Sequence, residues 1–325
     1  MTDQKLTIAI AGSTNHTVIC AQALLHNPNF KISWILTPQA KPVGRKKELK
    51  QNPLHQFALK NDIPVVLVDR KIDDEIKEII IKGMEKNKKI ANHFSLITPH
   101  FLLVVDFGYF IPNWLLKLPN IAPVNIHPSD LPKWRGSSPG QFVLLAGDKK
   151  SAVSIMEIND KFDQGPIINK QQFEVDPSWT QTEYYLYSFN LISKALPQIL
   201  VKYANKEITA KTQPLESPTP MARRLKKADA FVDWQILTDL MQNEAKDENL
   251  SVKLPLANPN SAQIVQACKA FQPWPVLWTL VPTTKGEKRM KIYACHVEQS
   301  KLILDEVQIE GKNKTKWNEI KNLIN

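Results

Sequence analysis

The segment Leu6–Thr14, with the sequence LTIAIAGST, decides the fold of this chain. A short apolar run ends at a Gly-Ser-Thr turn, and an apolar-periodic run then extends from Val18 to Leu25. This pattern predicts a strand, a tight turn and a helix, with Ser13 or Thr14 in position to cap the helix. A strand followed at once by a helix is typical of a parallel sheet covered by helices.

The same alternation continues through the first half of the chain. Further strands are predicted at Lys31–Leu36, Pro64–Val68, Leu102–Val105 and Pro123–His127, and further helices at Pro53–Leu59, Asp73–Lys88 and Ile111–Leu118. The run at 102–105 is apolar throughout, which is typical of a strand buried on both faces of a sheet. We therefore predict an α/β fold: a doubly wound, Rossmann-like sheet with right-handed crossovers.

The pattern changes after residue 150. Two strand-like runs, Ala152–Ile158 and Pro166–Phe173, predict a hairpin, and a long helix is predicted at Thr182–Tyr203. The aperiodic segment 205–220 is interpreted as a linker. Three strands beyond it, at Val276–Val281, Met290–Val297 and Leu302–Ile309, predict a small β-barrel. The predicted domains are therefore 1–204 and 221–325.

Composition limits the class of protein. A length of 325 residues suits two domains, and no apolar run is long enough to span a membrane. The three cysteines (Cys20, Cys268 and Cys295) are odd in number and widely spaced, which argues against a disulfide framework, so we expect a cytoplasmic protein. The net charge of +10 favours a polyanionic partner, although a solvated lysine surface gives the same charge.

Three polar residues carry the predicted chemistry. Asn125 and His127 alternate with apolar residues in a strand, so both side chains lie on one face at its carboxyl end, where α/β sheets bind ligands. Asp163 lies in a turn between two apolar strands, where Gly165 is expected to permit a positive φ. The alternative interpretation is an ordinary polar strand end and an ordinary turn aspartate.

The spacing of these residues resembles a known family. Asn-x-His at 125–127, Ser-x-Leu-Pro-x-x-Arg-Gly at 129–136 and Asp-x-Gly at 163–165 are similar to the signature of folate-dependent formyltransferases. The resemblance implies N10-formyltetrahydrofolate as the formyl donor and an amine as acceptor. It implies that Asn125 and His127 stabilise the oxyanion, and that Asp163 orients His127 and helps to accept the proton.

The resemblance also implies a donor pocket. Its expected residues are Asp106, Phe107, Gly108, Tyr109, Ser129, Leu131, Pro132, Asn159 and Phe162. The chain departs from the family in two places. Asp130 stands where the family usually has an apolar residue, and the turn from Gly12 to His16 replaces Gly-Thr-Pro-x-Phe. These departures leave the shape of the pocket loop and the role of the turn open.

Two further parts of the chain, a basic loop and the C-terminal segments, resemble methionyl-tRNA formyltransferases. The basic loop at 41–47 is similar to their Pro-x-Gly-Arg loop, with Arg45 at the arginine and Lys46 and Lys47 beside it. Segments 221–234, 271–275 and 306–312 resemble their C-terminal domain, a barrel of the oligonucleotide-binding type. The implied acceptor is initiator methionyl-tRNA, in support of translation initiation. Its further expected contacts are Lys226, Lys227, Lys288, Arg289 and Lys291.

Several rival functions are weighed against this one. A nicotinamide dehydrogenase lacks support because no Gly-x-Gly-x-x-Gly follows the first strand, and the seven histidines have no metal-ligand spacing, so no metal is expected. A formyltransferase acting on a sugar-nucleotide amine shares both domains and stays open. A non-catalytic RNA-binding protein is disfavoured by intact Asn125, His127 and Asp163. We expect a monomer without membrane association.

Overall fold

The computed structural model describes residues 5–43, 48–84, 96–242, 254, 256, 258–284 and 286–324. The chain divides into two compact units, and each is built from three segments. Unit 1 comprises Met1–Arg135, Ala152–Gln172 and Leu186–Pro218. Unit 2 comprises Gly136–Ser151, Phe173–Tyr185 and Thr219–Asn325. Two segments that precede residue 200 in the sequence therefore belong to the same unit as the C-terminal part of the chain.

Unit 1 is built around a seven-stranded sheet with the strand order β5-β2-β1-β6-β7-β8-β9. The strands are β1 (Leu6–Gly12), β2 (Phe30–Pro38), β5 (Val65–Val68), β6 (Phe101–Val105), β7 (Ala122–His127), β8 (Lys150–Glu157) and β9 (Ile167–Glu174). The first five are mutually parallel, and β8 runs antiparallel to β7. The two strands predicted after residue 150 are β8 and β9, and they are hydrogen-bonded neighbours in the sheet, as the predicted pairing requires.

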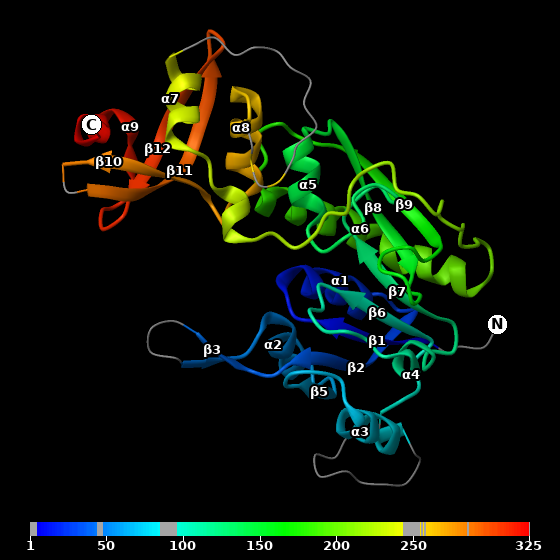
Figure 1. Ribbon diagram of the computed structural model, residues 1–325. Helices are drawn as coiled ribbons and strands as arrows, with labels where there is room; N and C mark the ends of the chain where they lie inside the picture. The colour runs from blue at the N-terminus through cyan, green and yellow to red at the C-terminus, as the bar shows by residue number, and fades with distance from the viewer. Residues whose placement is uncertain are drawn as a thin grey trace. The chain divides into compact units, whose positions relative to one another are not determined.

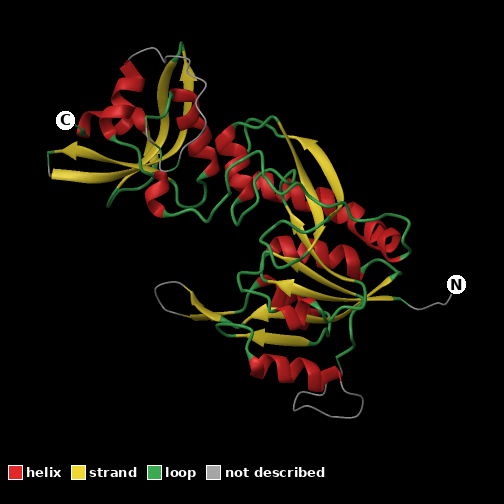
Figure 2. Cartoon of the chain, turned by 45° about the vertical axis from the view of Figure 1, so that its right-hand side comes forward, coloured by secondary structure: helices red, strands yellow, loops and turns green. Residues whose placement is uncertain are grey.

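Helices cover both faces of the sheet (Figures 1 and 2). They are α1 (Asn15–Leu25), α2 (Pro53–Lys60), α3 (Asp74–Met84), α4 (Asn113–Leu116) and α6 (Gln181–Ala204). On one face, Ala9, Trp34 and Leu102 pack against Ile76 and Ile80 of α3. The alternate residues of the same strands are buried on the opposite face. The prediction of a doubly wound, Rossmann-like sheet is confirmed.

The turn that begins the fold is tightly packed. Thr14, one of the two predicted capping residues, is the N-cap of α1, and its side chain accepts a hydrogen bond from the Thr17 amide. A Cβ on Gly12 would lie 2.4 Å from both Thr17 Cγ2 and the Val105 carbonyl oxygen. Only glycine fits at this position.

Unit 2 contains a four-stranded antiparallel sheet in the order β10-β11-β12-β13. The strands are β10 (Leu277–Thr283), β11 (Gly286–Glu298), β12 (Lys301–Ile309) and β13 (Thr315–Lys316). The three predicted C-terminal strands are confirmed, and an isolated bridge joins Thr283 to Ile324. The accompanying helices α5 (Pro139–Ala146), α7 (Trp234–Gln242), α8 (Ser261–Ala270) and α9 (Trp317–Ile320) were not predicted.

Leu277, Ile292 and Val307 form the apolar side of this second sheet and are fully buried. The sheet and α8 pack together within unit 2. All three cysteines are buried free thiols, as expected for core residues. In the described part of the chain, no helix is long and apolar enough to cross a membrane.

Candidate active site

The strand order of unit 1 locates a ligand-binding edge. The chain passes from β1 to β2 and β5 on one side, and then returns to place β6 and β7 on the other side of β1. In such sheets ligands bind at the carboxyl ends of the strands where the order reverses. The turn after β1, the segment 106–109 after β6 and the end of β7 all lie at this edge.

His127 and Asp163 form a buried pair. His127 Nδ1 lies 3.7 Å from Asp163 Oδ2, and the two side chains are 5% and 10% exposed. The distance suits an ion pair and exceeds that of a good hydrogen bond. His127 Nε2 lies 3.1 Å from the carbonyl oxygen of Trp134. The two ring nitrogens thus face oxygen atoms of two different segments, the Asp163 turn and the loop that follows β7.

Asn125 lies two residues before His127 on β7 and is half-buried. Its sheet neighbours are Val104 on β6 and Met156 on β8. Because alternate side chains of a strand share a face, the Asn125 amide and the His127 ring extend from the same side of β7. The structure therefore brings the three predicted catalytic residues to one strand end.

The turn that carries Asp163 differs from the prediction in one respect. The positive φ, 53°, belongs to Asp163 itself, and Gly165 is not among the residues with positive φ. Gly165 is required for another reason, because a Cβ there would lie 1.8 Å from the Glu157 carbonyl oxygen. The turn is therefore pressed against the end of β8.

The loop between His127 and Gly136 is held by a hydrogen bond within it and by two from other segments. Ser129 and Leu131 are fully buried. The Ser129 hydroxyl donates to the Lys133 carbonyl at 2.7 Å, and the Ser154 hydroxyl donates to the Ser129 carbonyl at 2.7 Å. The Ser217 hydroxyl donates to the Pro132 carbonyl at 2.7 Å. These contacts fix the shape of the loop.

The unusual Asp130 has a partner on β9. Lys170 Nζ lies 2.7 Å from Asp130 Oδ1, and the same ammonium group donates to the Leu131 carbonyl. Both side chains are about one-third exposed. A charged residue is therefore accommodated at this position by an ion pair that also ties the loop to β9.

Asp106, which follows β6 and is predicted to line the pocket of the formyl donor, contacts the turn after β1. Asp106 Oδ2 accepts a hydrogen bond from Thr14 Oγ1 at 2.9 Å and lies 2.8 Å from His16 Nδ1. The His16 ring stacks on Phe189 with centroids 4.7 Å apart. Sequence reasoning did not identify the His16–Asp106 pair, because the two residues are 90 positions apart and meet only through the pairing of β1 with β6.

The other residues predicted to line the pocket of the formyl donor differ in exposure. Phe107 and Tyr109 pack partly into the core, and the Tyr109 hydroxyl donates to the Asp69 carbonyl at 2.9 Å. Gly108 and Asn159 are not buried, and 60% of the Phe162 side chain is exposed. The exposed aromatic ring of Phe162 lies only one residue before the buried Asp163.

A buried arginine, Arg135, lies close enough to Asp163 to interact with its charge. Arg135, 5% exposed, donates through Nε and Nη2 to the side-chain oxygen of Gln213 at 3.2 and 3.0 Å. Burial lowers the pKa of Arg135 from its ordinary value, and the nearby Asp163 carboxylate opposes that change. Gln213 belongs to the segment predicted to be a linker, and no periodic signal marks it in the sequence.

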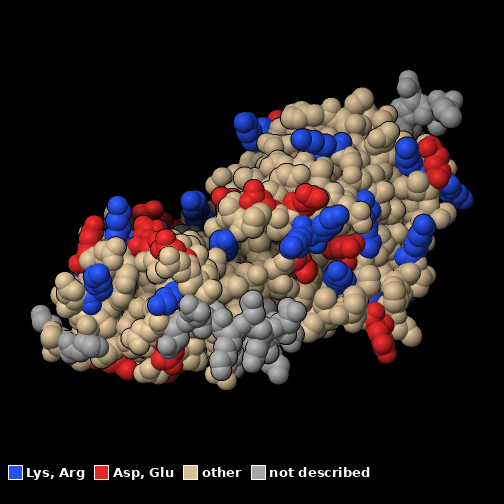
Figure 3. Space-filling model, turned by 90° about the horizontal axis from the view of Figure 1, so that it is seen from above, with Lys and Arg blue, Asp and Glu red and all other residues tan. Residues whose placement is uncertain are grey.

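The predicted tRNA contacts fall in two places. Arg45, Lys46 and Lys47 lie outside the described residues, but the flanking strands β3 (Lys41–Val43) and β4 (Glu48–Lys50) pair antiparallel. In unit 2, Lys226 and Lys227 are exposed, and the predicted contacts on β11 (Lys288, Arg289 and Lys291) are all half-buried. Among the coloured residues on the face that Figure 3 shows, basic and acidic side chains are interspersed.

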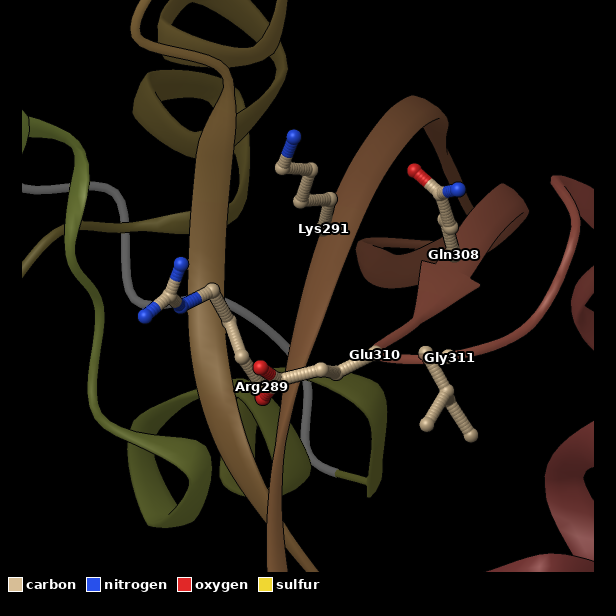
Figure 4. A pocket seen from close by; sticks show the side chains of 6 residues that line it. Arg289, Lys291, Gln308, Glu310 and Gly311 are labelled. Carbon is tan, nitrogen blue, oxygen red and sulfur yellow. The ribbon is translucent and has the colours of Figure 1, made fainter. Parts of the chain in front are cut away.

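Two of these residues flank an aromatic ring. Lys227 Nζ and Arg289 Cζ lie 5.8 and 5.2 Å from the centre of the Trp278 ring. Arg289 and Lys291 also line a shallow cavity of about 230 Å³, shown in Figure 4, whose wall is completed by Gln308, Ile309, Glu310 and Gly311. Cations beside an aromatic ring are a common feature of surfaces that bind single-stranded nucleic acid.

Curated methionyl-tRNA formyltransferases are similar to this chain in sequence. A methionyl-tRNA formyltransferase from Pseudoalteromonas translucida (strain TAC 125) is 27% identical over 298 residues, which cover 91% of this chain and 79% of that protein. Another, from Buchnera aphidicola subsp. Schizaphis graminum (strain Sg), is 28% identical over 281 residues, which cover 86% and 76%.

Solved structures show the same fold at lower identity. A methionyl-tRNA formyltransferase from Clostridium thermocellum has a TM-score of 0.51 and 17% identity, with 94% of this chain and 98% of that chain covered. An N-formyltransferase from Helicobacter canadensis, in complex with folinic acid and dTDP-3-aminofucose, has a TM-score of 0.55 and 16% identity over 90% and 89%. The family model described as formyl transferase matches residues 4–200, more than half of the sequence, and this chain therefore belongs to the formyl transferase family.

Proposed function

We propose that this protein transfers a formyl group from N10-formyltetrahydrofolate to the α-amino group of initiator methionyl-tRNA, and so supports translation initiation in the cytoplasm. The observation that carries the proposal is the buried His127–Asp163 pair beside Asn125, at the ligand-binding edge of a formyl transferase sheet. The similar methionyl-tRNA formyltransferases, matched over both halves of the chain, support the choice of acceptor.

In the proposed reaction the amine attacks the formyl carbon of the donor. A new C–N bond forms, and the formyl oxygen becomes an oxyanion that the Asn125 amide stabilises by donating a hydrogen bond. The His127 Nε2–H group turns from the Trp134 carbonyl to this oxygen. The bond to N10 then breaks, and tetrahydrofolate leaves.

Proton movement balances the reaction. The attacking amine loses one proton, and N10 of the departing tetrahydrofolate gains one. The His127–Asp163 pair accepts the proton, directly or through water, and returns it to N10. The buried carboxylate stabilises the positive imidazolium during this step. No covalent enzyme intermediate and no metal take part in the proposed reaction.

The donor and the tRNA are assigned to different parts of the chain. The proposed folate pocket comprises residues 106–109, the buried loop with Ser129, Leu131 and Pro132, and the exposed turn from Asn159 to Phe162. The proposed tRNA contacts are the basic loop at 45–47 and the basic residues of the domain 221–325, namely Lys226, Lys227, Lys288, Arg289 and Lys291. The protein is proposed to act as a monomer.

A stoichiometric assay tests the proposed reaction. Purified protein, N10-formyltetrahydrofolate and charged initiator methionyl-tRNA should yield formylmethionyl-tRNA and tetrahydrofolate in equal amounts. Release of tetrahydrofolate without formylated tRNA would show hydrolysis of the donor and contradict the proposal. Asn125→Ala should slow both products equally, because its amide stabilises the oxyanion that precedes both.

A further inference from the structure

The side-chain amide of Gln213 joins two buried parts of the catalytic unit. Its nitrogen donates to the carbonyl oxygens of Asp163 at 3.0 Å and Gly165 at 2.7 Å. Its oxygen accepts from Arg135 Nε and Nη2 at 3.2 and 3.0 Å. One amide thus links the turn that carries Asp163 to the loop that follows His127.

These contacts fix the orientation of the amide. With nitrogen and oxygen exchanged, donors would face the Arg135 guanidinium and an acceptor would face two carbonyl oxygens, so every contact would be unfavourable. Gln213 is only 6% exposed and Arg135 only 5% exposed. Removal of this amide would leave buried donors and acceptors without a partner, which is more costly than removal of an exposed hydrogen bond.

Arg135 anchors the chain on the other side of the amide. Its Nη1 donates to the Leu215 carbonyl at 3.0 Å, and its Nη2 donates to the Pro214 carbonyl at 2.7 Å. The guanidinium therefore binds three consecutive residues, 213–215. Arg135 directly follows Trp134, whose carbonyl faces His127 Nε2. Both nitrogens of the His127 ring are thus positioned by groups attached to this network.

The turn held by Gln213 contains a residue in an unfavourable backbone conformation. Asp163 has a φ of 53°, a left-handed conformation that costs a non-glycine residue free energy. Two hydrogen bonds to the carbonyls of Asp163 and Gly165 hold the backbone on either side of Gln164. The backbone conformation at Asp163 determines where its carboxylate lies relative to His127.

We propose that Gln213, held by Arg135, is a positioning residue that keeps the Asp163 carboxylate beside His127 during formyl transfer. Residues 213–215 then act as part of the active-site support, although the sequence marks them as a linker. The positioning role rests on the proposed function only in that the protein must catalyse formyl transfer, and not on which amine is the acceptor. It is tested with whichever amine the wild-type protein formylates, so failure of the acceptor assignment and failure of the positioning role are separate results.

The test is a double-mutant cycle on the transfer rate. Gln213→Ala should lower kcat by about tenfold, within the range of coupling between contacting residues, with the KM of both substrates nearly unchanged. In the Asp163→Asn background the same substitution should have almost no further effect on kcat. The matched control is Gln171→Ala on β9, which removes an amide that donates locally to Asn169 and should leave kcat unchanged.

A second variant separates positioning from folding. Gln213→Glu keeps an acceptor for Arg135 but removes both donors to the Asp163 turn. It should reproduce the fall in kcat while the thermal unfolding midpoint stays closer to that of wild type than in Gln213→Ala. An equal fall in kcat in the wild-type and Asp163→Asn backgrounds, or wild-type kcat in Gln213→Glu, would overturn the proposal.

Discussion

At the scale of single residues, the structure places His127 between two acceptors, the Asp163 carboxylate and the Trp134 carbonyl. A ring in this position is suited to carry a proton briefly and to return it. His127→Ala should therefore lower kcat for formyl transfer by about 10²- to 10⁴-fold, the usual contribution of a general acid–base residue. The matched control is His26→Ala at the end of α1, outside the proposed site, which should retain the wild-type rate. Binding of tRNA, measured by filter retention, should persist in both variants, and a wild-type rate in His127→Ala would exclude the proposed role.

The residues proposed to carry the chemistry could be named from the sequence, whereas the buried residues that contact them could not. The two-residue period of a strand puts Asn125 and His127 on one face. The resemblance of their spacing, together with Asp163, to the formyltransferase signature singled the three residues out. Gln213 and His16 have no such local signal. Their contacts are with residues 50 and 90 positions away, which only folding brings close.

At the scale of elements, the β1–α1 turn depends on the absence of a side chain at Gly12. Gly12→Ala would force its Cβ against Thr17 and the end of β6, so the free energy of unfolding should fall by about 1–3 kcal/mol, as for overpacked cores. Gly108→Ala is the matched control at the same edge, since nothing lies within 4 Å of a Cβ there. Urea denaturation of both variants measures the difference, and equal stabilities would contradict the account of this turn.

The short helix η1 (Lys227–Ala230) in unit 2 provides a pH-dependent test. Hydrogen bonds from Arg223 hold the pKa of Asp229 below its ordinary value, and the Lys226 amide contributes in the same direction. A depressed carboxylate pKa stabilises the fold above the unfolded pKa, about 3.9, and this contribution disappears as pH falls through the folded pKa. Asp229→Asn should therefore destabilise the protein at pH 7 and much less at a pH below the folded pKa. Urea unfolding across that range measures the change, and a pH-independent difference would contradict this explanation.

The boundaries of elements show what sequence patterns leave out. The helix predicted at Ile111–Leu118 is reduced to Asn113–Leu116, because Pro112 takes the N-cap position and Pro119 disfavours a helical residue before it. Helix α5 was not predicted, since its apolar residues are buried by tertiary packing and lack an amphipathic period. The continuous apolar strands of the central sheet, by contrast, were recognisable from residue type alone.

At the scale of the whole molecule, the net charge of +10 favours tRNA, but the basic residues proposed to bind it are few. The logarithm of the association constant for tRNA falls linearly with the logarithm of the salt concentration, and removing one phosphate-binding side chain should make this slope shallower by about 0.9 or less. Arg289→Ala combined with Lys291→Ala should therefore weaken tRNA binding and flatten its salt dependence, while kcat at saturating tRNA stays unchanged. Lys117→Ala, an exposed lysine on unit 1, is the control. An unchanged slope in the double variant would remove these residues from the proposed tRNA surface.

This formyl transferase is proposed to act on an amine carried by tRNA. The most direct measurement compares kcat/KM for charged initiator methionyl-tRNA with that for a nucleotide-sugar amine, with the same protein and the same N10-formyltetrahydrofolate. We predict efficient formylation of methionyl-tRNA, its near-abolition in His127→Ala, and no appreciable formylation of the sugar amine. Formylation of the sugar amine with methionyl-tRNA left untouched would contradict the account.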